Sequence, residues 1–284
     1  MILKGLGVIV TGGSTGIGKT VAHSCLLAGA DVLICARNSD LLKTAKAELA
    51  GAGPGRLLTE EVDVSNAADV ERLIGSACKH LGNFGAVVNA AGVLGPIGEL
   101  DEIAVEDWIR VLKINLIGTM LVSRSVLPHF RKRGSGKILT FSGGGGTNPR
   151  PRFSAYAASK AAVVRFSENL AQELSGTNIF VNAVAPGAVN TRMLDETIAA
   201  GSEKTGEAAF KDALKQKSDG GASAARAAAL CVKLLSPEAD GLTGKLLSAV
   251  WDPWESVADW KDQAMQNDVY TLRRIVPSDR GLKF

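Results

Sequence analysis

Tyr156 and Lys160 stand four residues apart in a stretch that is amphipathic with helical periodicity up to about Leu174. On a helix, side chains four residues apart share a face, so the phenol and the ammonium group would be neighbours. A nearby cation favours the phenolate and lowers a tyrosine pKa from its ordinary value of ~10. The pair therefore predicts that Tyr156 exchanges a proton with an alcohol or a carbonyl, tuned by Lys160. A solvated pair on a helix surface is the commoner origin of this spacing, so the rest of the chain must decide.

A glycine-rich stretch near the start of the chain could hold phosphate. Residues 6–11 are apolar, as in a buried parallel strand, and residues 12–18 carry four glycines before an amphipathic helix to about residue 28. Glycines permit a sharp turn and the close approach of a pyrophosphate, and a helix N-terminus supplies N–H groups and a positive dipole end. This order predicts a dinucleotide-binding loop; a purely structural glycine turn is the alternative.

Strand-like and helix-like segments alternate along most of the chain. After the first strand, further strands are expected at residues 31–36, 57–63, 85–88, 137–142, 179–184 and 245–250. The expected helices include residues 39–50, 106–131, 156–174 and 222–235. Because no linker interrupts the alternation, the pattern predicts an α/β fold with one doubly wound, seven-stranded parallel sheet and helices on both faces.

Two segments depart from this alternation. Residues 192–221 are rich in Ala, Gly, Lys and Glu, and they fall where a lid over a substrate site would be inserted. Residues 251–284 carry three tryptophans and Tyr270, which predicts a C-terminal extension that packs on the core or on a subunit interface. Residues 1–250 would then form a single dinucleotide-binding and catalytic domain.

Composition argues against several classes of protein. The chain has 284 residues, 46% of them hydrophobic, and a net charge of +3 without a basic block, which argues against a nucleic-acid partner. No apolar run approaches the length of a membrane span, and the run at residues 6–10 is too short for a signal sequence. The four cysteines show no paired spacing and the three histidines no metal-site spacing. We therefore expect a cytoplasmic protein with reduced thiols, no membrane partner and no metal.

Together these motifs resemble the short-chain dehydrogenase/reductase family over roughly residues 5–250. The matching residues, in the order and spacing of that family, are Thr11, Gly12, Gly16, Gly18, Asp63, Asn89, Ala90, Ala91, Gly92, Asn115, Tyr156, Lys160, Pro186, Gly187 and Thr191. Each is common alone, but the set is specific. The resemblance implies a Rossmann-like fold, a nicotinamide dinucleotide cofactor, and self-association as a homo-tetramer or homodimer.

The resemblance also implies roles for individual residues. Tyr156 would donate the proton in carbonyl reduction or accept it in alcohol oxidation. Lys160 would also bind the nicotinamide ribose, and Asn115 would help to hold a water molecule in the proton relay. The implied cofactor contacts are Gly12, Ser14, Gly16, Ile17 and Gly18 for the pyrophosphate, Asp63 and Val64 for the adenine, Asn89 and Ala90 with Gly92 for the ribose, and Pro186, Val189 and Thr191 for the nicotinamide end.

The choice of cofactor can be argued from charge. A site that prefers NAD places a carboxylate roughly 20 residues beyond the glycines, near the end of the second strand, to bind the ribose 2′-hydroxyl. Here that position reads Cys35-Ala36-Arg37-Asn38, which offers no carboxylate. A guanidinium suits a 2′-phosphate through bidentate, charge-assisted hydrogen bonds. Arg37, with Asn38 beside it, therefore predicts NADP(H); an ordinary surface arginine is the alternative.

One position departs from the family pattern. The family usually has a catalytic serine about 13 residues before the tyrosine, and here that position is Gly143, preceded by Ser142. Ser142 could take over the role, or backbone N–H groups or Thr147 could polarise the carbonyl instead. An impaired active site is a third possibility.

The leading hypothesis is an NADP(H)-dependent oxidoreductase that interconverts a secondary alcohol and a ketone, with Tyr156 as general acid and base and Ser142, Asn115 and Lys160 beside it. Arg150 and Arg152 precede the catalytic helix and could face a polar, sugar-like or anionic substrate; solvated loop charges are an equal alternative. One alternative function is an epimerase that acts through a transient ketone. From a different class, the chain could be an NADP(H)-binding sensor that performs no chemistry.

Overall fold

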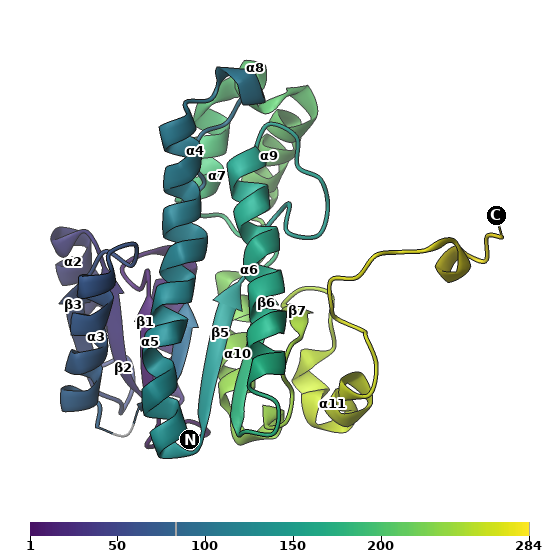
Figure 1. The fold of residues 1–284 in the computed structure, drawn as a ribbon. Coiled ribbons are helices and arrows are strands. Elements are labelled where there is room, and N and C mark those ends of the chain that lie inside the picture. The colour runs from purple at the N-terminus through teal and green to yellow at the C-terminus, as the bar shows by residue number, and fades with distance from the viewer. Residues whose placement is uncertain (83, 284) are drawn as a thin grey trace.

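The computed structural model describes residues 1–82 and 84–283, and these contain one seven-stranded parallel sheet in the order β3-β2-β1-β4-β5-β6-β7 (Figure 1). The strands are β1 (Gly7–Thr11), β2 (Asp31–Ala36), β3 (Leu57–Glu61), β4 (Phe84–Asn89), β5 (Gly136–Phe141), β6 (Ile179–Ala185) and β7 (Leu246–Ser248). Every expected strand is present, so the predicted doubly wound α/β fold is confirmed.

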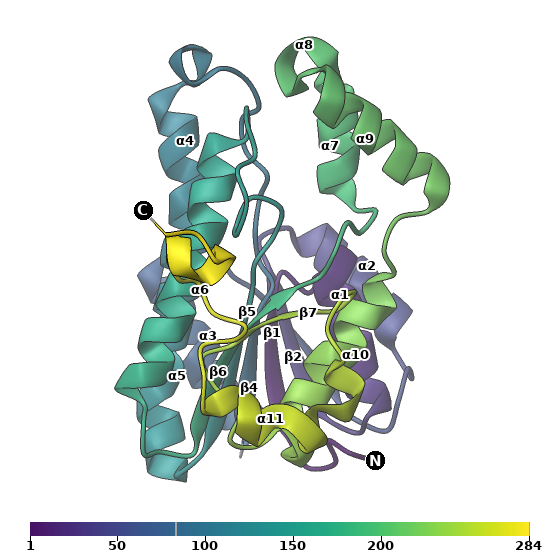
Figure 2. The ribbon, with the colours of Figure 1, turned by 90° about the vertical axis from the view of Figure 1, so that its right-hand side faces the viewer.

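Helices cover both faces of the sheet (Figures 1 and 2). The helices are α1 (Gly16–Leu27), α2 (Ser39–Leu49), α3 (Ala67–His80), α4 (Val105–Leu112), α5 (Gly118–Arg133), α6 (Ser154–Glu173), α7 (Arg192–Ala199), α8 (Gly201–Thr205), α9 (Glu207–Asp219), α10 (Ala224–Leu235) and α11 (Val257–Met265). Helices α1, α2 and α10 bury apolar side chains against one face, and α3, α5 and α6 against the other.

The alternation of side chains along each strand produces these two cores. In β1, Val8 and Val10 point toward α1, whereas Ile9 between them points toward α3 and α5. All three are fully buried, and each such side chain stabilises the fold by about 1.5–3 kcal/mol relative to an exposed one. Burial on both faces explains why these strands are nearly continuous apolar runs rather than alternating ones.

The strand order reverses at β1, which pairs with β2 on one side and with β4 on the other. In open α/β sheets, ligands bind at such a reversal, beyond the carboxyl ends of the strands. The loops after β1 and β4 are in contact there: a Cβ built on Gly12, whose φ is +65°, would lie 2.8 Å from Ala91 Cα. Only glycine permits this approach, which positions both loops at one crevice.

Helices α4 and α5 form one continuous helical run through a π-helical turn, η2 (Lys113–Ile117), in which the Gly118 N–H donates to Lys113 O. By length and composition alone, residues 105–133 could cross a membrane, which corrects the expectation that no stretch has that length. In the fold, Val122, Val126 and Phe130 of this run are fully buried against the sheet. A helix in the cover layer of a sheet meets the same criterion of length and composition.

The two segments outside the alternation form helices of their own. Residues 192–219 fold as α7, α8 and α9, which stand beyond the carboxyl ends of the strands, across from α4 in Figure 2. The closing motion expected of a lid stays a prediction. After β7, Trp254 and Val257 pack in the core, and the chain then passes along α6, where Leu272 N donates to Glu168 Oε1 (2.6 Å). The last residues extend away from the body of the molecule (Figure 1).

Candidate active site

Tyr156 and Lys160 lie in the first two turns of α6 and are both buried. Lys160 Nζ donates a hydrogen bond to Phe141 O at the end of β5 (2.9 Å) and lies 5.7 Å from the centroid of the Tyr156 ring. The ring itself packs in a small apolar cluster with Leu94 and Phe153. The predicted pairing on one helix face is thus confirmed, but it is buried rather than solvated.

The phenol of Tyr156 is tuned differently from the sequence prediction. Burial raises the pKa of Tyr156 above its ordinary value, and the cation that opposes this rise is Arg150. Burial also lowers the pKa of Lys160 from 10.5 to about 8. The expectation that Lys160 pulls down the pKa of Tyr156 is therefore wrong in this structure, because burial acts on both groups and the ammonium is directed at a backbone carbonyl.

Replacing Lys160 with methionine should change how stability depends on pH. Since folding lowers the pKa of Lys160 from 10.5 to about 8, the folded state carries a penalty that is full below pH 8 and is relieved as the pH rises toward 10.5. Methionine carries no such penalty. The free energy of unfolding of the wild type minus that of Lys160→Met should therefore rise by about 2 kcal/mol between about pH 7 and pH 9.5. Urea unfolding at several pH values measures it; a constant difference would contradict the burial effect.

Asn115 lies in the π-helical turn and is buried. Its Oδ1 accepts from Val93 N (2.9 Å), while its Nδ2 donates to Val93 O and to Ser159 Oγ, both at 3.0 Å. These bonds fix the loop after β4 to α6. A Cβ built on Gly92 would lie 3.3 Å from Asn115 Oδ1 and 3.7 Å from Lys160 Nζ, so Gly92 separates this cluster from the crevice. The role of Asn115 in a proton relay stays a prediction.

The glycine run after β5 decides where the Tyr156 phenol can lie. A Cβ built on Gly143 would lie 2.4 Å from Tyr156 Oη, so the phenol oxygen rests directly against the backbone at the position of the family's serine. Ser142 is buried, and its Oγ lies 2.4 Å from a Cβ built on Gly146. Within residues 1–82 and 84–283, no hydrogen bond involves Ser142 Oγ. A catalytic role for Ser142 therefore stays a prediction without a hydrogen bond to support it.

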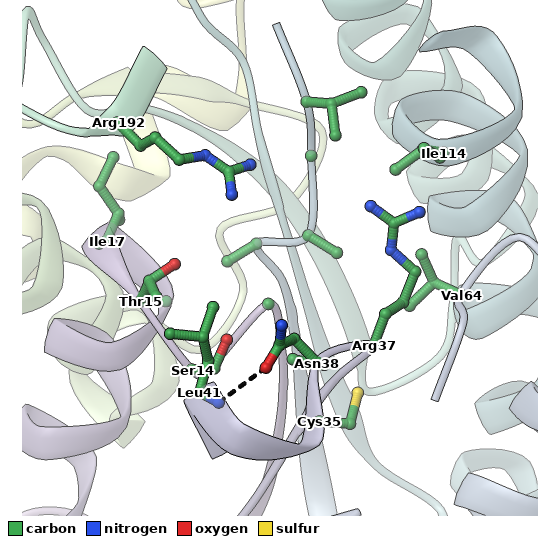
Figure 3. Close-up of a pocket in the computed structure, with 18 of the residues that line it drawn as sticks. Ser14, Thr15, Ile17, Cys35, Arg37, Asn38, Leu41, Val64, Ile114 and Arg192 are labelled. Carbon is green, nitrogen blue, oxygen red and sulfur yellow. Dashed lines mark hydrogen bonds between the residues drawn. The ribbon is translucent and has the colours of Figure 1, made fainter. Parts of the chain in front are cut away.

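A cavity of about 540 Å³ lies in the crevice between the loops after β1 and β4 (Figure 3). Of the predicted cofactor residues, the cavity is lined by Gly12, Ser14, Gly16, Ile17, Gly18, Arg37, Asn38, Val64, Ala90, Gly92 and Thr191. The guanidinium groups of Arg37 and Arg192 both reach into it in Figure 3. Asn38 also caps α2, because its Oδ1 accepts from Leu41 N (2.8 Å). The structure thus brings together most of the residues chosen for the dinucleotide.

The chemistry of this cavity suits the phosphates of a dinucleotide. Helix α1 begins at Gly16 after Thr15, whose side chain makes no capping hydrogen bond, and its first turn holds no acidic residue. The N–H groups and the positive dipole end therefore face the cavity without a competing side-chain acceptor. A Cβ on Gly18 would lie 2.3 Å from Gly12 O, so the helix packs on the loop as closely as glycine allows. The residues present fit a nicotinamide dinucleotide.

Several predicted cofactor contacts do not line the cavity. The Asn89 side chain is a correction: its Nδ2 donates to Ser123 Oγ (3.3 Å) and Leu139 O (3.4 Å), so it joins strands to α5 instead of facing a ribose. Asp63 lies at the rim, where its Oδ1 accepts from Ser65 N (2.9 Å) and Oγ (2.6 Å). Pro186 and Val189 lie outside the cavity lining. Their contacts with the nicotinamide end stay predictions.

Two arginines lie closer to the site than the sequence suggested. Arg192, at the start of α7, was not predicted; it reaches the cavity, and its Nε lies 3.0 Å from Glu196 Oε1. In the sequence, the sign that Arg192 belongs to the cavity was its position directly after Thr191, a predicted cofactor contact. Arg150 was left open between a substrate contact and a solvated loop charge, and in the structure its Cζ lies 3.9 Å from the Phe153 ring centroid and 5.7 Å from that of Tyr156.

Comparisons with known proteins agree with this geometry. The family model described as short chain dehydrogenase matches residues 7–201. A short chain dehydrogenase of Pseudocercospora fijiensis is 37% identical, over 67% of this chain and 62% of its own. An 11-beta-hydroxysteroid dehydrogenase-like protein of Arabidopsis thaliana is 36% identical, over 66% of this chain and 60% of its own. A 3beta-hydroxysteroid dehydrogenase of Eggerthella lenta is 35% identical, over 68% of this chain and 74% of its own. The match thus spans less than two thirds of the first two relatives.

Solved structures extend the likeness over more of the chain. An actinorhodin polyketide ketoreductase with NADPH superposes with a TM-score of 0.78 at 29% identity, covering 86% of this chain and 95% of the other. A xylitol dehydrogenase with bound NAD⁺ superposes with a TM-score of 0.81 over 87% and 98%; at 22% identity it shows the fold alone. Motifs, fold and relatives agree, and the chain belongs to the short chain dehydrogenase family.

Proposed function

We propose that the protein is an NADP(H)-dependent oxidoreductase that interconverts a secondary alcohol and a ketone, with Tyr156 as general acid and base. The observation that carries this proposal is the position of Gly92. It lines the dinucleotide cavity, and a Cβ built on it would lie 3.7 Å from Lys160 Nζ. Lys160 is in turn 5.7 Å from the Tyr156 ring centroid. Tyr156 and Lys160 do not line the cavity themselves, but Gly92 connects its wall to Lys160 and so supports a proton transfer close to a bound nicotinamide.

Different residues of the chain have different roles in the proposed reaction. A bound nicotinamide supplies or accepts the hydride, and the protein supplies position and electrostatics. Tyr156 Oη gives its proton to the carbonyl oxygen in reduction, or takes it from the hydroxyl in oxidation. Asn115 holds the loop after β4 through its two bonds to Val93, which keeps Gly92 and the cavity wall in place. The apolar cluster around Tyr156 holds its ring in place.

Arg37 supports NADP(H) over NAD(H). It lines the cavity, and the Cys35-Ala36-Arg37-Asn38 stretch brings no carboxylate to the place of the ribose 2′-hydroxyl. The nearest carboxylate is Asp63, whose Oδ2 lies 4.0 Å from Arg37 Nη1 and could orient the guanidinium. Among the relatives, one structure holds NADPH and another NAD⁺, so the argument depends on this arginine.

Substituting Arg37 should therefore change cofactor selectivity. Arg37→Gln is expected to weaken NADPH binding by at least about 10-fold, because a charge-assisted hydrogen bond contributes roughly 1.5–3 kcal/mol. Binding of NADH, which lacks the 2′-phosphate, should change little. Fluorescence titration with both cofactors measures this. Arg72→Gln is a matched control, since Arg72 pairs with Asp69 (2.6 Å) and lies outside the cavity lining. A wild-type preference for NADH would defeat the assignment.

The surroundings of Tyr156 limit the substrate class. Beside the phenol lie Leu94 and Phe153, with Ile97, Met193 and Ala209 packed against them, so one wall is apolar. Arg150 is the polar group over the ring. We propose a ketone or secondary alcohol with an apolar body and a polar or anionic group; the sugar-like substrate stays a prediction. Two hydroxysteroid dehydrogenases among the relatives make cyclic ketones sensible first candidates.

A screen of ketones and secondary alcohols, including steroid-like and sugar-like ones, against NADPH and NADH tests the proposal. NADPH consumption with at least one ketone is expected. Substrate isomerisation without net NADPH consumption would favour an epimerase instead. Tight NADPH binding without turnover on any compound would favour a non-catalytic sensor, which the glycine at position 143 keeps open. A homo-tetramer or homodimer in the cytoplasm is part of the proposal, and light scattering tests the assembly.

A further inference from the structure

Arg150 lies over the catalytic tyrosine. Its guanidinium carbon is 3.9 Å from the Phe153 ring centroid and 5.7 Å from the Tyr156 ring centroid. A Cβ built on Gly144 would lie 3.3 Å from Arg150 Nη1, while one built on Gly143 would lie 2.4 Å from Tyr156 Oη. The guanidinium and the phenol oxygen therefore rest on consecutive residues of the glycine run. This arrangement needs glycines, because side chains there would separate the two groups.

The charge of Arg150 is not neutralised by a neighbour. Within residues 1–82 and 84–283, its guanidinium makes no hydrogen bond and no ion pair. Arg152, two residues along the same loop, is the opposite case: its Nη2 lies 2.5 Å from Glu99 Oε1, and its Nη1 donates to Glu203 O at the end of α8 (2.5 Å). Arg152 thus links this loop to the segment 192–221, whereas the guanidinium of Arg150 faces Tyr156.

The other groups around Tyr156 do not take over the role of this cation. The family's serine is replaced by Gly143, so no hydroxyl stands beside the phenol oxygen. Lys160 Nζ donates to Phe141 O, and burial lowers its pKa to about 8, where half of its charge is lost. The ring also packs against apolar side chains from the loop after β4 and from α7 and α9. An arginine, by contrast, keeps its charge throughout the working pH range.

We propose that Arg150 is the positioning residue that stabilises the phenolate of Tyr156. When Tyr156 Oη passes its proton to a carbonyl oxygen, the negative charge left on the phenolate faces the guanidinium until solvent restores the proton. In the reverse direction, the same cation favours the phenolate that accepts the alcohol proton. The kinetic part of this inference rests on the proposed oxidoreductase function; the electrostatic part does not.

Titration of the phenol tests the electrostatic part without any substrate. The chain contains two tyrosines, so Tyr270→Phe leaves Tyr156 as the one phenol, observable by ultraviolet difference absorbance. In this background, Arg150→Met should raise the titration midpoint of Tyr156 by about one pH unit, because an opposite charge at this range shifts a pKa by about that amount or more. Arg150→Lys should restore most of the shift. Circular dichroism confirms that each variant is folded.

Arg152→Gln is the matched control from the same loop, and it should leave the midpoint unchanged. An unchanged midpoint in folded Arg150→Met, or an equal rise in Arg152→Gln, would overturn the inference. Once a substrate is known, kcat/KM of Arg150→Met should fall about 10-fold at neutral pH, and Arg150→Lys should recover it. If the midpoint shifts although no ketone is ever turned over, the proposed function fails while the inference about Arg150 stands. A loss of substrate binding without a midpoint shift would instead assign Arg150 to an anionic substrate group.

Discussion

Tyr156→Phe should lower turnover by about 10³-fold while leaving NADPH binding and stability nearly unchanged, because general acid–base catalysis typically contributes 10²–10⁴-fold. The substitution removes one oxygen and keeps the ring that packs against Leu94 and Phe153. Among the described residues, that oxygen donates no hydrogen bond, so its loss leaves no buried partner unsatisfied. Steady-state kinetics with the best ketone from the screen measures the effect.

Tyr270→Phe is the matched control, since it removes the other phenol of the chain. Tyr270 packs against Trp260 after β7, with ring centroids 5.5 Å apart, far along the chain from the catalytic helix. Its activity should equal that of the wild type. Turnover retained within a few-fold in Tyr156→Phe would remove the tyrosine from the mechanism and, with it, the reason for the proposed reaction.

Gly143→Ala should lower kcat/KM by about 100-fold. A Cβ at this position would lie 2.4 Å from Tyr156 Oη, which no real contact allows, so the phenol must move. Displacing a reacting group by about 1 Å costs on the order of 10²-fold in rate. Gly143→Ser, which restores the residue usual in the family, should be impaired as well, because serine brings the same Cβ. Kinetics with both variants, alongside NADPH binding, separate a displaced phenol from a lost cofactor site.

Gly75→Ala provides the control for removing a glycine. Gly75 is exposed on α3, and a Cβ there would meet nothing within 4 Å. Alanine at such a helix position should raise stability by about 0.5–1 kcal/mol and leave kinetics unchanged. Wild-type activity in Gly143→Ala would show that the phenol of Tyr156 can move away from residue 143 without loss of rate. It would contradict the conclusion that a glycine is needed there.

The fold could be predicted from the sequence because buried strands and glycine loops leave local marks. The apolar runs at residues 31–36 and 179–184 can hardly be anything but strands with both faces covered. The π-helical turn at η2 was not predictable, since residues 113–117 keep an ordinary helical pattern. Nor could composition distinguish the buried helix at residues 105–133 from a membrane span, because both need a long apolar stretch.

The parts of the site that backbone geometry forms could be predicted from the sequence. The parts that depend on side-chain packing were harder to predict. Gly12 and Gly18 are needed by close backbone approaches that the motif itself encodes. The pKa of Tyr156 depends on burial and on the position of Arg150, which spacing alone cannot give. Asn89 could have been placed correctly: two residues after Val87 on β4, it must share the face that turns toward α5.

The widened turn at residues 113–117 has a consequence for how this chain can change in length. The π-helical turn holds one residue more than an α-helical turn, so removing a residue within it would leave the helices on either side nearly in phase. Removing a residue from the regular helix α5, by contrast, would rotate everything beyond it by about 100°. Asn115 could not then reach both Val93 and Ser159 while Phe130, farther along α5, stayed against the sheet. Deletions of single residues in α5 should therefore be far less tolerated than a deletion within residues 113–117, whereas the exposed end of the chain can vary in length.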